Sequence, residues 1–325
     1  MKKICITGAG GFIGSHLTEM LVKKGFYVVA FDRYNTNNHY GWLENSKYKK
    51  DINFQLGDIR DYDYVEKVLG QVDFCIHLAA LIGIPYSYIS PAAYIKTNIE
   101  GSYNILQASL KKKLKKVIIV STSEIYGSAQ YIPIDEAHPI SCQSPYSATK
   151  LAADQLALSY YKSFGLPVKV ARPFNTYGPR QSLRAIIPTL LSQFINKDKI
   201  VKVGSVDTVR DFTYVEDTCE GIFSIFKSSS LYGEVTNIGS NNSISIKDLI
   251  NCIKIIFNVQ NIKIKTDQQR VRPQKSEVIK LQCNNKKLIK ATQWKAKTSL
   301  KNGLEKTSKW LEKNINYFKK DIYNI

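Results

Sequence analysis

The sequence predicts an α/β protein with a doubly wound parallel sheet and a smaller, interleaved α+β lobe. In the first half of the chain, short and nearly continuous apolar runs alternate with amphipathic stretches, which is typical of strands covered on both faces. The runs lie at residues 3–7, 27–31, 72–77, 117–121 and 168–171. A glycine-rich turn directly follows the first run. Repeated units of this kind imply right-handed crossovers between parallel strands.

The helices expected between these strands have recognisable ends. Residues 15–24 place Leu17 and Leu21 on one helical face, and Gly25 follows as a natural C-cap. Another helix is expected to start near Tyr94 and to end in the lysine run at residues 111–116, whose charge complements the helix dipole. The lysine run is therefore interpreted as a helix end rather than a nucleic-acid patch.

The alternation of strands and helices loosens after Pro173. Residues 173–208 and 240–325 are expected to form the smaller, substrate-binding lobe. Residues 1–172, with a contribution from about 209–239, are expected to form the larger domain. The chain has no internal repeat or low-complexity linker, so the boundary is predicted to be interleaved.

The 325-residue chain is strongly basic, with 46 Lys+Arg against 27 Asp+Glu and a net charge of +19. Such an excess is compatible with a nucleic-acid partner, because phosphate contacts dominate non-specific affinity. Only eight of the cations are arginine, and the excess concentrates after residue 250 among apolar positions. A solvated lysine surface is favoured over nucleic-acid binding, and a large anionic substrate is the third interpretation.

Six scattered cysteines form no CxxC pair and no metal-ligand spacing, so we expect a reduced, cytoplasmic protein without a metal site. The N-terminus enters the first strand too early for a signal peptide, and no apolar run reaches about 18 residues. We therefore expect no export and no membrane span.

The glycine-rich turn, with Gly8, Gly11 and Gly14, lies between the first strand and the first helix. Glycines there let backbone N–H groups approach a pyrophosphate at a helix N-terminus. The spacing misses the usual dinucleotide fingerprint by one residue, because Ile13 occupies its third place. Its position between strand and helix nevertheless predicts a Rossmann-type dinucleotide site.

Asp32 ends the second strand, where a carboxylate can accept hydrogen bonds from the ribose of an adenosine. A carboxylate also repels a 2′-phosphate, which favours NAD over NADP. Arg33 follows directly and leaves NADP as the minor alternative. Alternatively, Asp32 is a strand-end residue in a turn and has a purely structural role.

Tyr146 and Lys150 are predicted to share one face of a helix that follows Pro145. A nearby ammonium favours the phenolate, which lowers the tyrosine pKa and makes the side chain a general base for a sugar hydroxyl. The same spacing also suits a surface Tyr and Lys on any helix. The run from Ser121 to Glu124 ends a central strand and is the second part of this candidate centre.

Taken together, these motifs resemble the extended short-chain dehydrogenase/reductase family, in its nucleotide-sugar-modifying branch, over nearly the whole chain. The supporting segments are residues 57–61, 77–80, 121–124, 172–180, 210–217 and 272–273, with Tyr146 and Lys150. Thr122-Ser123-Glu124 matches the 4,6-dehydratase pattern of the Ser-Glu type. Residues 84–88, 130–139 and 272–278 look like the 4,6-dehydratase of the bacterial legionaminic-acid pathway.

The resemblance implies roles for individual residues. The catalytic group would be Thr122, Ser123, Glu124, Tyr146 and Lys150, with Glu124 removing the C5 proton and either Ser123 or Glu124 protonating the leaving hydroxyl. NAD would be held by Gly8, Gly11, Phe12, Ile13, Gly14, Asp32, Asp58, Ile59, Leu78, Ala79, Ala80 and Asn98, with Tyr146 and Lys150. The substrate would meet Tyr86, Ser87, Asn175, Arg180, Arg210 and Arg272, the arginines facing its diphosphate.

The implied activity is 4,6-dehydration of a nucleotide-linked N-acetylglucosamine, with the GDP form favoured and the UDP form as alternative. A 4-epimerase or a UDP-glucuronate decarboxylase of the same branch is the first rival, and a dinucleotide sensor without catalysis is the second. Helices at about 94–111 and 146–164 resemble the pair that forms a four-helix dimer interface. A homodimer is therefore expected, with higher assemblies left open.

Overall fold

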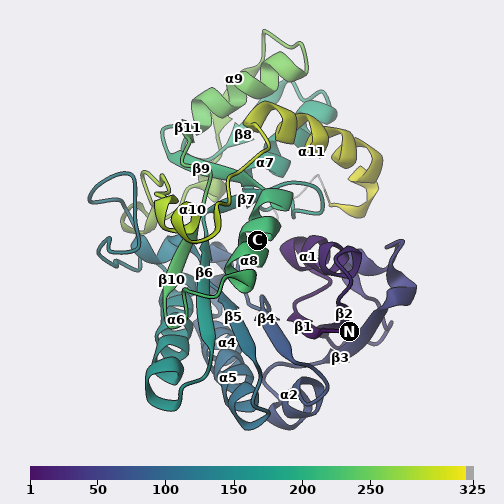
Figure 1. The fold of residues 1–325 in the computed structure, drawn as a ribbon. Helices are drawn as coiled ribbons and strands as arrows, with labels where there is room; N and C mark the ends of the chain where they lie inside the picture. Colours follow the sequence, from purple (N-terminus) through teal and green to yellow (C-terminus); the bar gives the residue numbers. More distant parts are fainter. Residues whose placement is uncertain (320–325) are drawn as a thin grey trace.

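The computed structural model describes residues 1–319 and builds them around a seven-stranded sheet in which every pairing is parallel (Figure 1). The strands are β1 (Lys3–Thr7), β2 (Tyr27–Arg33), β3 (Ile52–Gly57), β4 (Phe74–His77), β5 (Lys116–Val120), β6 (Val168–Pro173) and β10 (Val235–Ile238). Their order is β10-β6-β5-β4-β1-β2-β3, so the winding reverses between β1 and β4. This arrangement confirms the predicted doubly wound parallel sheet.

Five of the seven strands coincide with the apolar runs, whereas β3 and β10 were not predicted. Both are edge strands of the sheet. Residues 53–57 of β3 are only half-buried. A strand at the edge of a sheet needs no continuous apolar run, so a prediction based on such runs does not find it.

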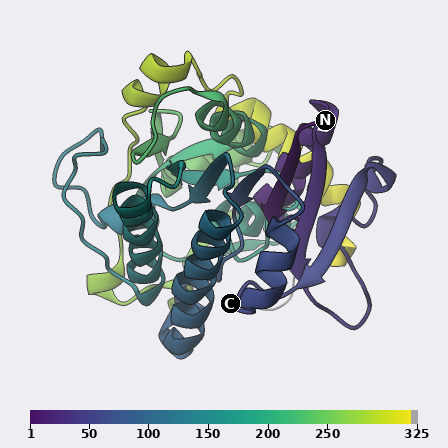
Figure 2. The ribbon, with the colours of Figure 1, turned by 60° about the horizontal axis from the view of Figure 1, so that its bottom comes forward.

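Helices cover both faces of the large sheet. The helices of the large domain are α1 (Phe12–Lys23), α2 (Tyr62–Leu69), α3 (Ile84–Ile89), α4 (Pro91–Tyr94), α5 (Gly101–Lys111), α6 (Pro145–Phe164) and α8 (Val215–Lys227). Helices α1 and α8 pack together on one face, and α2, α5 and α6 lie in sequence on the other, in front of the sheet in Figure 2. Alternate residues of β1 divide accordingly, because Ile4 and Ile6 join one core and Cys5 joins the other.

The predicted helix ends are only partly correct. Helix α1 starts at Phe12, three residues before the predicted start, and Gly25 follows its end with a positive φ of 81°. The helix expected from Tyr94 consists of α4, one π-helical turn over Ile95–Glu100, and α5. Lys111 ends α5, whereas Lys116 already begins β5, so the lysine run is shared between a helix end and a strand start.

The smaller lobe carries two further sheets. Its strands are β7 (Asn175–Tyr177), β8 (Ile200–Val203), β9 (Val209–Tyr214), β11 (Ser243–Ser245) and β12 (Lys263–Thr266), and its helices are α7 (Ile186–Ile195), α9 (Ile246–Ile256), α10 (Lys286–Thr292) and α11 (Leu300–Asn314). The three-stranded sheet has the order β11-β9-β7, and β12 pairs with β8. Short 3-10 turns lie at Gly41–Leu43, Lys49–Asp51, Ser123–Tyr126, Gln268–Arg270, Gln274–Ser276 and Ile315–Tyr317.

Two elements lie on the other side of the expected domain boundary. Strand β9 pairs with β7 and β11, so residues 209–214 belong to the small sheet rather than to the large domain. Helix α10 lies beside β10 and α8 of the large domain, although its residues were expected in the lobe. Strand pairing places β9, and packing against β10 and α8 places α10.

Aromatic side chains join the two lobes. Trp42, in the segment after β2, packs edge to face against Trp310 of α11, with ring centroids 5.2 Å apart. Tyr317 and Phe318 pack on the same Trp42 ring. These contacts fix the C-terminal helix to the large domain.

Within residues 1–319, no helix combines the length and the apolar character needed to cross a membrane. The six cysteines are free, and four of them are buried.

Candidate active site

A cavity of about 870 Å³ lies at the carboxyl ends of the large sheet's strands and is bordered on its other side by the smaller lobe. Gly8 after β1, Asp32 in β2, Leu78 after β4 and Val120 in β5 line it, together with Arg210 from the lobe. Ligand crevices form at this edge of open parallel sheets, next to the point where the winding reverses.

Most of the residues singled out from the sequence meet in this one cavity. The lining includes Gly8, Gly11, Phe12, Ile13, Gly14, Asp32, Asp58, Ile59, Leu78, Ala79, Ala80, Tyr86, Thr122, Glu124, Tyr146, Lys150, Asn175, Arg210 and Arg272. Ser87, Asn98, Ser123 and Arg180 are outside that lining.

The glycine turn exposes backbone rather than side chains at the N-terminus of α1. Gly8 has a φ of 68°, and a Cβ there would lie 2.9 Å from the backbone nitrogen of Ala79. A Cβ on Gly14 would collide with the carbonyl oxygen of Gly8. A side chain at either position is therefore excluded, and the space beside the helix N-terminus suits a pyrophosphate.

The carboxylate of Asp32 is held against this turn. It accepts hydrogen bonds from the backbone N–H of Gly10 at 2.5 Å and of Arg33 at 2.7 Å. A Cβ on Gly10 would lie 2.6 Å from the Asp32 carboxylate, so Gly10 must be glycine, a requirement that the spacing analysis missed. Burial raises the pKa of Asp32, and both backbone hydrogen bonds oppose that shift.

Asp58 is part of an ion pair at the same end of the cavity. Nη2 of Arg60 lies 2.5 Å from Oδ2 of Asp58, and the hydrogen bonds from Arg60 lower the pKa of Asp58. The guanidinium of Arg60 is thus already engaged by a carboxylate. This makes it a poor receptor for a 2′-phosphate.

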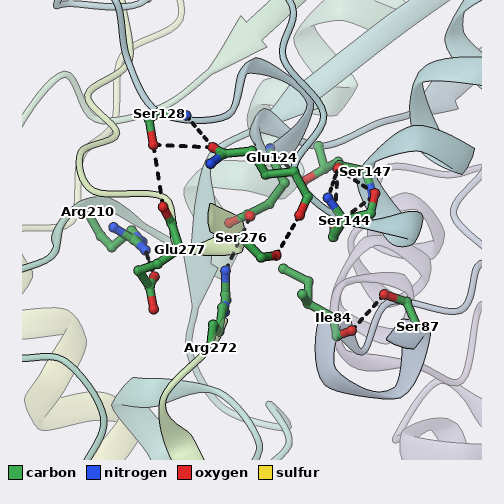
Figure 3. A network of polar contacts seen from close by, with 12 residues as sticks. Ile84, Ser87, Glu124, Ser128, Ser144, Ser147, Arg210, Arg272, Ser276 and Glu277 are labelled. Atoms are coloured by element: carbon green, nitrogen blue, oxygen red, sulfur yellow. Dashed lines mark hydrogen bonds and ion pairs between the residues drawn. The ribbon is translucent and has the colours of Figure 1, made fainter. Parts of the chain in front are cut away.

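The central group of side chains comes from two neighbouring elements. Thr122 follows β5 and N-caps the 3-10 turn that carries Glu124. Tyr146 lies in the first turn of α6, whose N-terminus is fixed by a capping box between Ser144 and Ser147 (Figure 3). Strand end and helix start thereby bring a hydroxyl, a carboxylate and a phenol into one wall.

Tyr146 is strongly desolvated. Burial raises its pKa well above the ordinary tyrosine value, while a hydrogen bond with Thr122 and the charge of Arg184 oppose the shift. The charge of Glu124 adds to the increase. Tyr94 packs edge to face on the same ring, with centroids 6.4 Å apart.

Lys150 occupies the predicted helix face. Its Nζ donates a hydrogen bond to the carbonyl oxygen of Val120 at 2.7 Å. Burial lowers the pKa of Lys150 to about 8, with the nearby Asp154 opposing the shift. Four-residue spacing gives a shared face, but the hydrogen bond to β5 sets the direction of the ammonium.

Two ion pairs lie at the end of the cavity that the smaller lobe lines (Figure 3). Nη1 of Arg272 lies 3.5 Å from Oε2 of Glu124. Nη2 of Arg210 lies 3.2 Å from Oε1 of Glu277, and the Arg210 side chain is buried. Glu277 belongs to the segment 272–278, and the sequence predicts no role for it, because its place in the cavity depends on the path of a loop that residue spacing does not reveal.

Two of the residues outside the lining form hydrogen bonds with the backbone instead. The side chain of Asn98 binds the N–H and C=O of Leu81, at 2.8 and 3.0 Å. The hydroxyl of Ser87 donates to the carbonyl oxygen of Ile84 at 2.7 Å (Figure 3). These contacts shape the loop and the helix behind the cavity wall.

Arg180 and Ser123 also differ from their expected positions. Nη2 of Arg180 lies 3.0 Å from Oε2 of Glu19 on α1, so this guanidinium joins the lobe to the first helix. Ser123 is buried behind the wall, between Thr122 and Glu124. Arg184, four residues after Arg180, lines the cavity, but the sequence did not predict it as a site residue. Both arginines lie in one loop, and a loop has no periodicity from which the direction of each side chain could be predicted.

Comparisons with known proteins place the chain among nucleotide-sugar enzymes. A family model described as GDP-mannose 4,6 dehydratase matches residues 5–307. A dTDP-glucose 4,6-dehydratase of Streptomyces antibioticus is 32% identical, over 79% of this chain and 77% of the relative. A UDP-N-acetyl-alpha-D-glucosaminuronate decarboxylase of Bacillus cytotoxicus is 33% identical, over 95% of this chain and 98% of the relative.

Solved structures agree with the fold. The crystal structure of a dTDP-glucose 4,6-dehydratase from Bacillus anthracis in complex with NAD superposes with a TM-score of 0.86. The two chains are 28% identical, and the match covers 98% of this chain and 99% of the other.

Proposed function

Because the chain belongs to the GDP-mannose 4,6 dehydratase family, we propose that it converts a nucleotide-linked N-acetylglucosamine into the 4-keto-6-deoxy sugar. GDP-N-acetylglucosamine is the favoured substrate, for legionaminic-acid or related surface-glycan synthesis. The observation that carries the proposal is a carboxylate, Glu124, on the same cavity wall as Thr122 and Tyr146. Oxidation at C4 needs only the phenol and the hydroxyl, whereas elimination also needs a base for the C5 proton.

NAD fits the large-domain half of the cavity. The backbone cradle of Gly8 and Gly14 would hold its pyrophosphate, and Asp32 would bind the adenosine ribose. NAD bound there would supply the hydride acceptor for oxidation at C4 and the hydride donor for reduction at C6. Arg60 is paired with Asp58, which supports NAD over NADP.

The side chains of the protein carry the proton transfers. Tyr146, as phenolate, accepts the proton of the 4-hydroxyl, and Thr122 hydrogen-bonds the same oxygen. The resulting 4-ketone acidifies the C5 proton, which Glu124 removes. The C6 hydroxyl then leaves as water after receiving a proton. When C6 is reduced, C5 takes a proton from solvent, and Tyr146 releases to solvent the proton that it accepted from the 4-hydroxyl.

We assign protonation of the leaving hydroxyl to Glu124 alone. Having taken the C5 proton, Glu124 can deliver it to the C6 oxygen. Ser123, the other candidate from the sequence, is buried and outside the cavity lining, which supports this assignment. One carboxyl group then acts first as base and then as acid.

The substrate diphosphate is proposed to bind at Arg210 and Arg272. Both line the lobe side of the cavity, and Nη1 of Arg272 is buried without a hydrogen-bond acceptor among residues 1–319. Asn175, whose Oδ1 is likewise buried and unpartnered within those residues, lies in the same wall. Unsatisfied donors and acceptors of this kind are costly unless a ligand pairs with them.

UDP-N-acetylglucosamine is the second candidate substrate, and a 4-epimerase or decarboxylase is the second candidate activity. The 33% identity with the Bacillus cytotoxicus decarboxylase supports decarboxylation as a candidate activity. Tyr146 and Thr122 serve all of these reactions, so Glu124 is the residue that distinguishes them.

The deciding experiment is incubation with GDP-N-acetylglucosamine, UDP-N-acetylglucosamine, dTDP-glucose and UDP-glucuronate, followed by mass spectrometry. Loss of one water from an N-acetylglucosamine nucleotide supports the proposal. Unchanged mass with a new diastereomer indicates an epimerase, and loss of carbon dioxide indicates a decarboxylase.

We further propose a homodimer through α5 and α6. Tyr103 on α5 and Phe164 on α6 leave 44% and 58% of their surface exposed, which is unusual for large apolar side chains on adjacent helices. Light scattering should give twice the chain mass of 36.8 kDa, and Phe164→Asp should lower that value.

A further inference from the structure

Residues 268–277 carry two of the charged side chains that line the cavity, Arg272 and Glu277. This segment follows β12 and leads into Val278, which is buried in a small apolar core together with Ile125. Strand pairing holds one end of the segment, and the apolar core holds the other. The position of Arg272 therefore depends on the contacts that hold the residues in between.

The side-chain amide of Gln143 makes one of these contacts. Its Nε2 donates a hydrogen bond to the carbonyl oxygen of Lys275 at 2.8 Å, and its Oε1 accepts one from the backbone N–H of Ser128 at 2.7 Å. Ser128 follows the 3-10 turn that carries Glu124, and Gln143 lies just before α6, which carries Tyr146. One side chain therefore joins the segment to both of the elements that supply the proposed catalytic groups.

Both ends of this amide are specified by their partners. The N–H of Ser128 can only donate and the carbonyl of Lys275 can only accept, so the orientation of the Gln143 amide is fixed. Gly127 has a φ of 63°, and a Cβ there would lie 2.8 Å from Oε1 of Gln143. The glycine thus allows the amide to lie close against the turn.

Ser276 provides a second connection. Its hydroxyl donates to the main-chain carbonyl oxygen of Gln143 at 2.5 Å. Because a serine hydroxyl has a single hydrogen, the 2.6 Å contact between Ser276 and the hydroxyl of Tyr88 requires the tyrosine to be the donor. Tyr88 lies on α3, so the segment is also tied to a third element. The hydroxyl of Ser128 lies 3.4 Å from the carbonyl oxygen of Glu277 on the same side (Figure 3).

The residues that make these connections do not themselves face a ligand. Gln143, Ser276 and Tyr88 are outside the cavity lining, whereas Arg272 and Glu277 are part of it. A change in the amide of Gln143 can therefore reach a bound diphosphate only through the residues to which the amide is bonded.

We propose that Gln143 is a positioning residue for the diphosphate site, whose amide holds segment 268–277 so that Arg272 faces the cavity. This role rests on the proposed function, because it takes Arg272 as a diphosphate ligand. Without the amide, the segment keeps both of its ends, but Arg272 is no longer held where the diphosphate binds. Affinity for the nucleotide sugar then falls, while the chemistry of the bound sugar persists.

The first test needs no ligand. Hydrogen exchange of the amides in segment 268–277 is followed by mass spectrometry in the NAD-bound protein. Gln143→Met, which keeps the length of the side chain, should speed this exchange about tenfold. Gln274→Met, the same change on an exposed side chain of the same segment, is the matched control and should have no effect. Equal exchange in wild type and Gln143→Met would overturn the proposal.

Gln143→Glu separates the two halves of the amide. The carboxylate can still accept from Ser128 but has no hydrogen to donate to Lys275. Exchange in the segment should therefore rise as it does in Gln143→Met. Wild-type exchange in a folded Gln143→Glu protein would mean that Gln143 only supports the turn at Ser128, and the proposal would be wrong.

The second test is a double-mutant cycle with Arg272, measured by calorimetry with GDP and with UDP. Gln143→Met should raise the Kd about three- to tenfold in the wild-type background. In the Arg272→Gln background the same change should alter the Kd by less than about twofold, because the contact that Gln143 positions is already lost. Additive effects would show that Gln143 does not act through Arg272.

Turnover gives an independent readout. Gln143→Met should raise KM for the nucleotide sugar about three- to tenfold and leave kcat within about twofold of wild type. A lower kcat with unchanged KM would place its effect on Tyr146 at the start of α6 and contradict the proposal.

Tyr88→Phe is the second variant in case Gln143→Met folds poorly. It removes only the hydroxyl that donates to Ser276, from a side chain that is 37% exposed. Nucleotide binding should weaken about two- to threefold, and this effect should also vanish in the Arg272→Gln background. An unchanged Kd together with unchanged hydrogen exchange in this variant would count against the proposal.

The two proposals fail in different ways. If the wild-type protein binds GDP or UDP but dehydrates no sugar, the proposed function is wrong, and the cycle still decides the role of Gln143. If dehydration occurs and the cycle is additive, only the role of Gln143 is wrong. If neither nucleotide binds, both proposals are wrong.

Discussion

Nη1 of Arg272 lies 3.5 Å from Oε2 of Glu124, so one ion pair joins the proposed diphosphate site to the proposed C5 base (Figure 3). That nitrogen is buried and has no hydrogen-bond acceptor among residues 1–319. A diphosphate oxygen would offer the short, charge-assisted bond that Glu124 does not make. Substrate binding is therefore expected to weaken the ion pair between Arg272 and Glu124.

Glu124→Gln should separate oxidation from elimination. The amide keeps the shape of the side chain but cannot remove the C5 proton, so dehydration should fall by about 100-fold or more. Cofactor reduction, followed by absorbance at 340 nm, should persist because Tyr146 and Thr122 are intact. Unimpaired dehydration by this variant would remove the C5-base assignment.

Arg272→Gln should act mainly on substrate binding. Loss of a charge-assisted contact to the diphosphate is expected to raise KM about 10- to 100-fold, with a smaller change in kcat. Lys275→Gln, three residues further along and exposed, is the matched control and should leave KM unchanged. A variant with normal KM but low kcat would instead place Arg272 at the reacting carbons.

Asp32→Ser should weaken NAD binding. Loss of one ribose hydrogen bond to a carboxylate costs about 1.5–3 kcal/mol, so the Kd for NAD should rise at least about 10- to 100-fold. The Kd for NADP, measured by the same titration, should rise less or fall, because the repulsion of a 2′-phosphate is removed. Equal weakening of both cofactors would mean that Asp32 only supports the glycine turn through Gly10.

Asp154→Ala should destabilise the large domain. Asp154 of α6 lies 2.8 Å from Nη2 of Arg172 on β6, and both side chains are buried. Removing one partner of a buried pair leaves an uncompensated charge and costs about 3–5 kcal/mol, measurable by urea unfolding. Glu220→Gln breaks the exposed pair with Lys24 and should cost less than about 1 kcal/mol. Similar losses in both variants would show that Arg172 is solvated.

Because His77 is buried in its neutral form, the free energy of unfolding should fall as the pH becomes acidic. Burial lowers its pKa from 6.5 to about 3, so between these values the unfolded state binds a proton that the folded state does not. Stability therefore rises with pH there, by about 1.4 kcal/mol per pH unit for one proton. His77→Gln should remove this contribution from urea unfolding curves recorded between pH 4 and 6.

The wild-type slope alone does not isolate His77. His16, whose pKa burial lowers to about 4, acts in the same direction, and Asp211, whose pKa burial raises to about 6, acts in the opposite one. The difference in slope between wild type and His77→Gln is the decisive quantity. Parallel curves would show that His77 is protonated in the folded protein.

The sequence predicts the parts of the site that depend on local order. Thr122 and Glu124 follow a buried strand, and Tyr146 opens a helix, so strand ends and helix periodicity suffice to bring them to one edge of the sheet. The glycine turn is recognisable for the same reason. The large sheet itself follows from apolar runs, except for its two edge strands.

Other features depend on contacts between distant segments. Arg180 and Arg184 are four residues apart in one loop, yet the first pairs with Glu19 on α1 and the second faces Gly83. Gly10 must be glycine because the backbone carbonyl of Tyr40, together with the carboxylate of Asp32, lies beside it. Neither relationship has a periodicity, so no sequence pattern distinguishes these residues from their neighbours.

The edge-to-face contact between Trp42 and Trp310 gives the protein an optical reporter. Only three tryptophans occur in the chain, and these two are in direct contact across the junction of the large domain and the smaller lobe. Any rotation of the lobes around a ligand will change the environment of both indoles at once. Intrinsic fluorescence should therefore report any such rotation in real time, with Trp294 as a buried background.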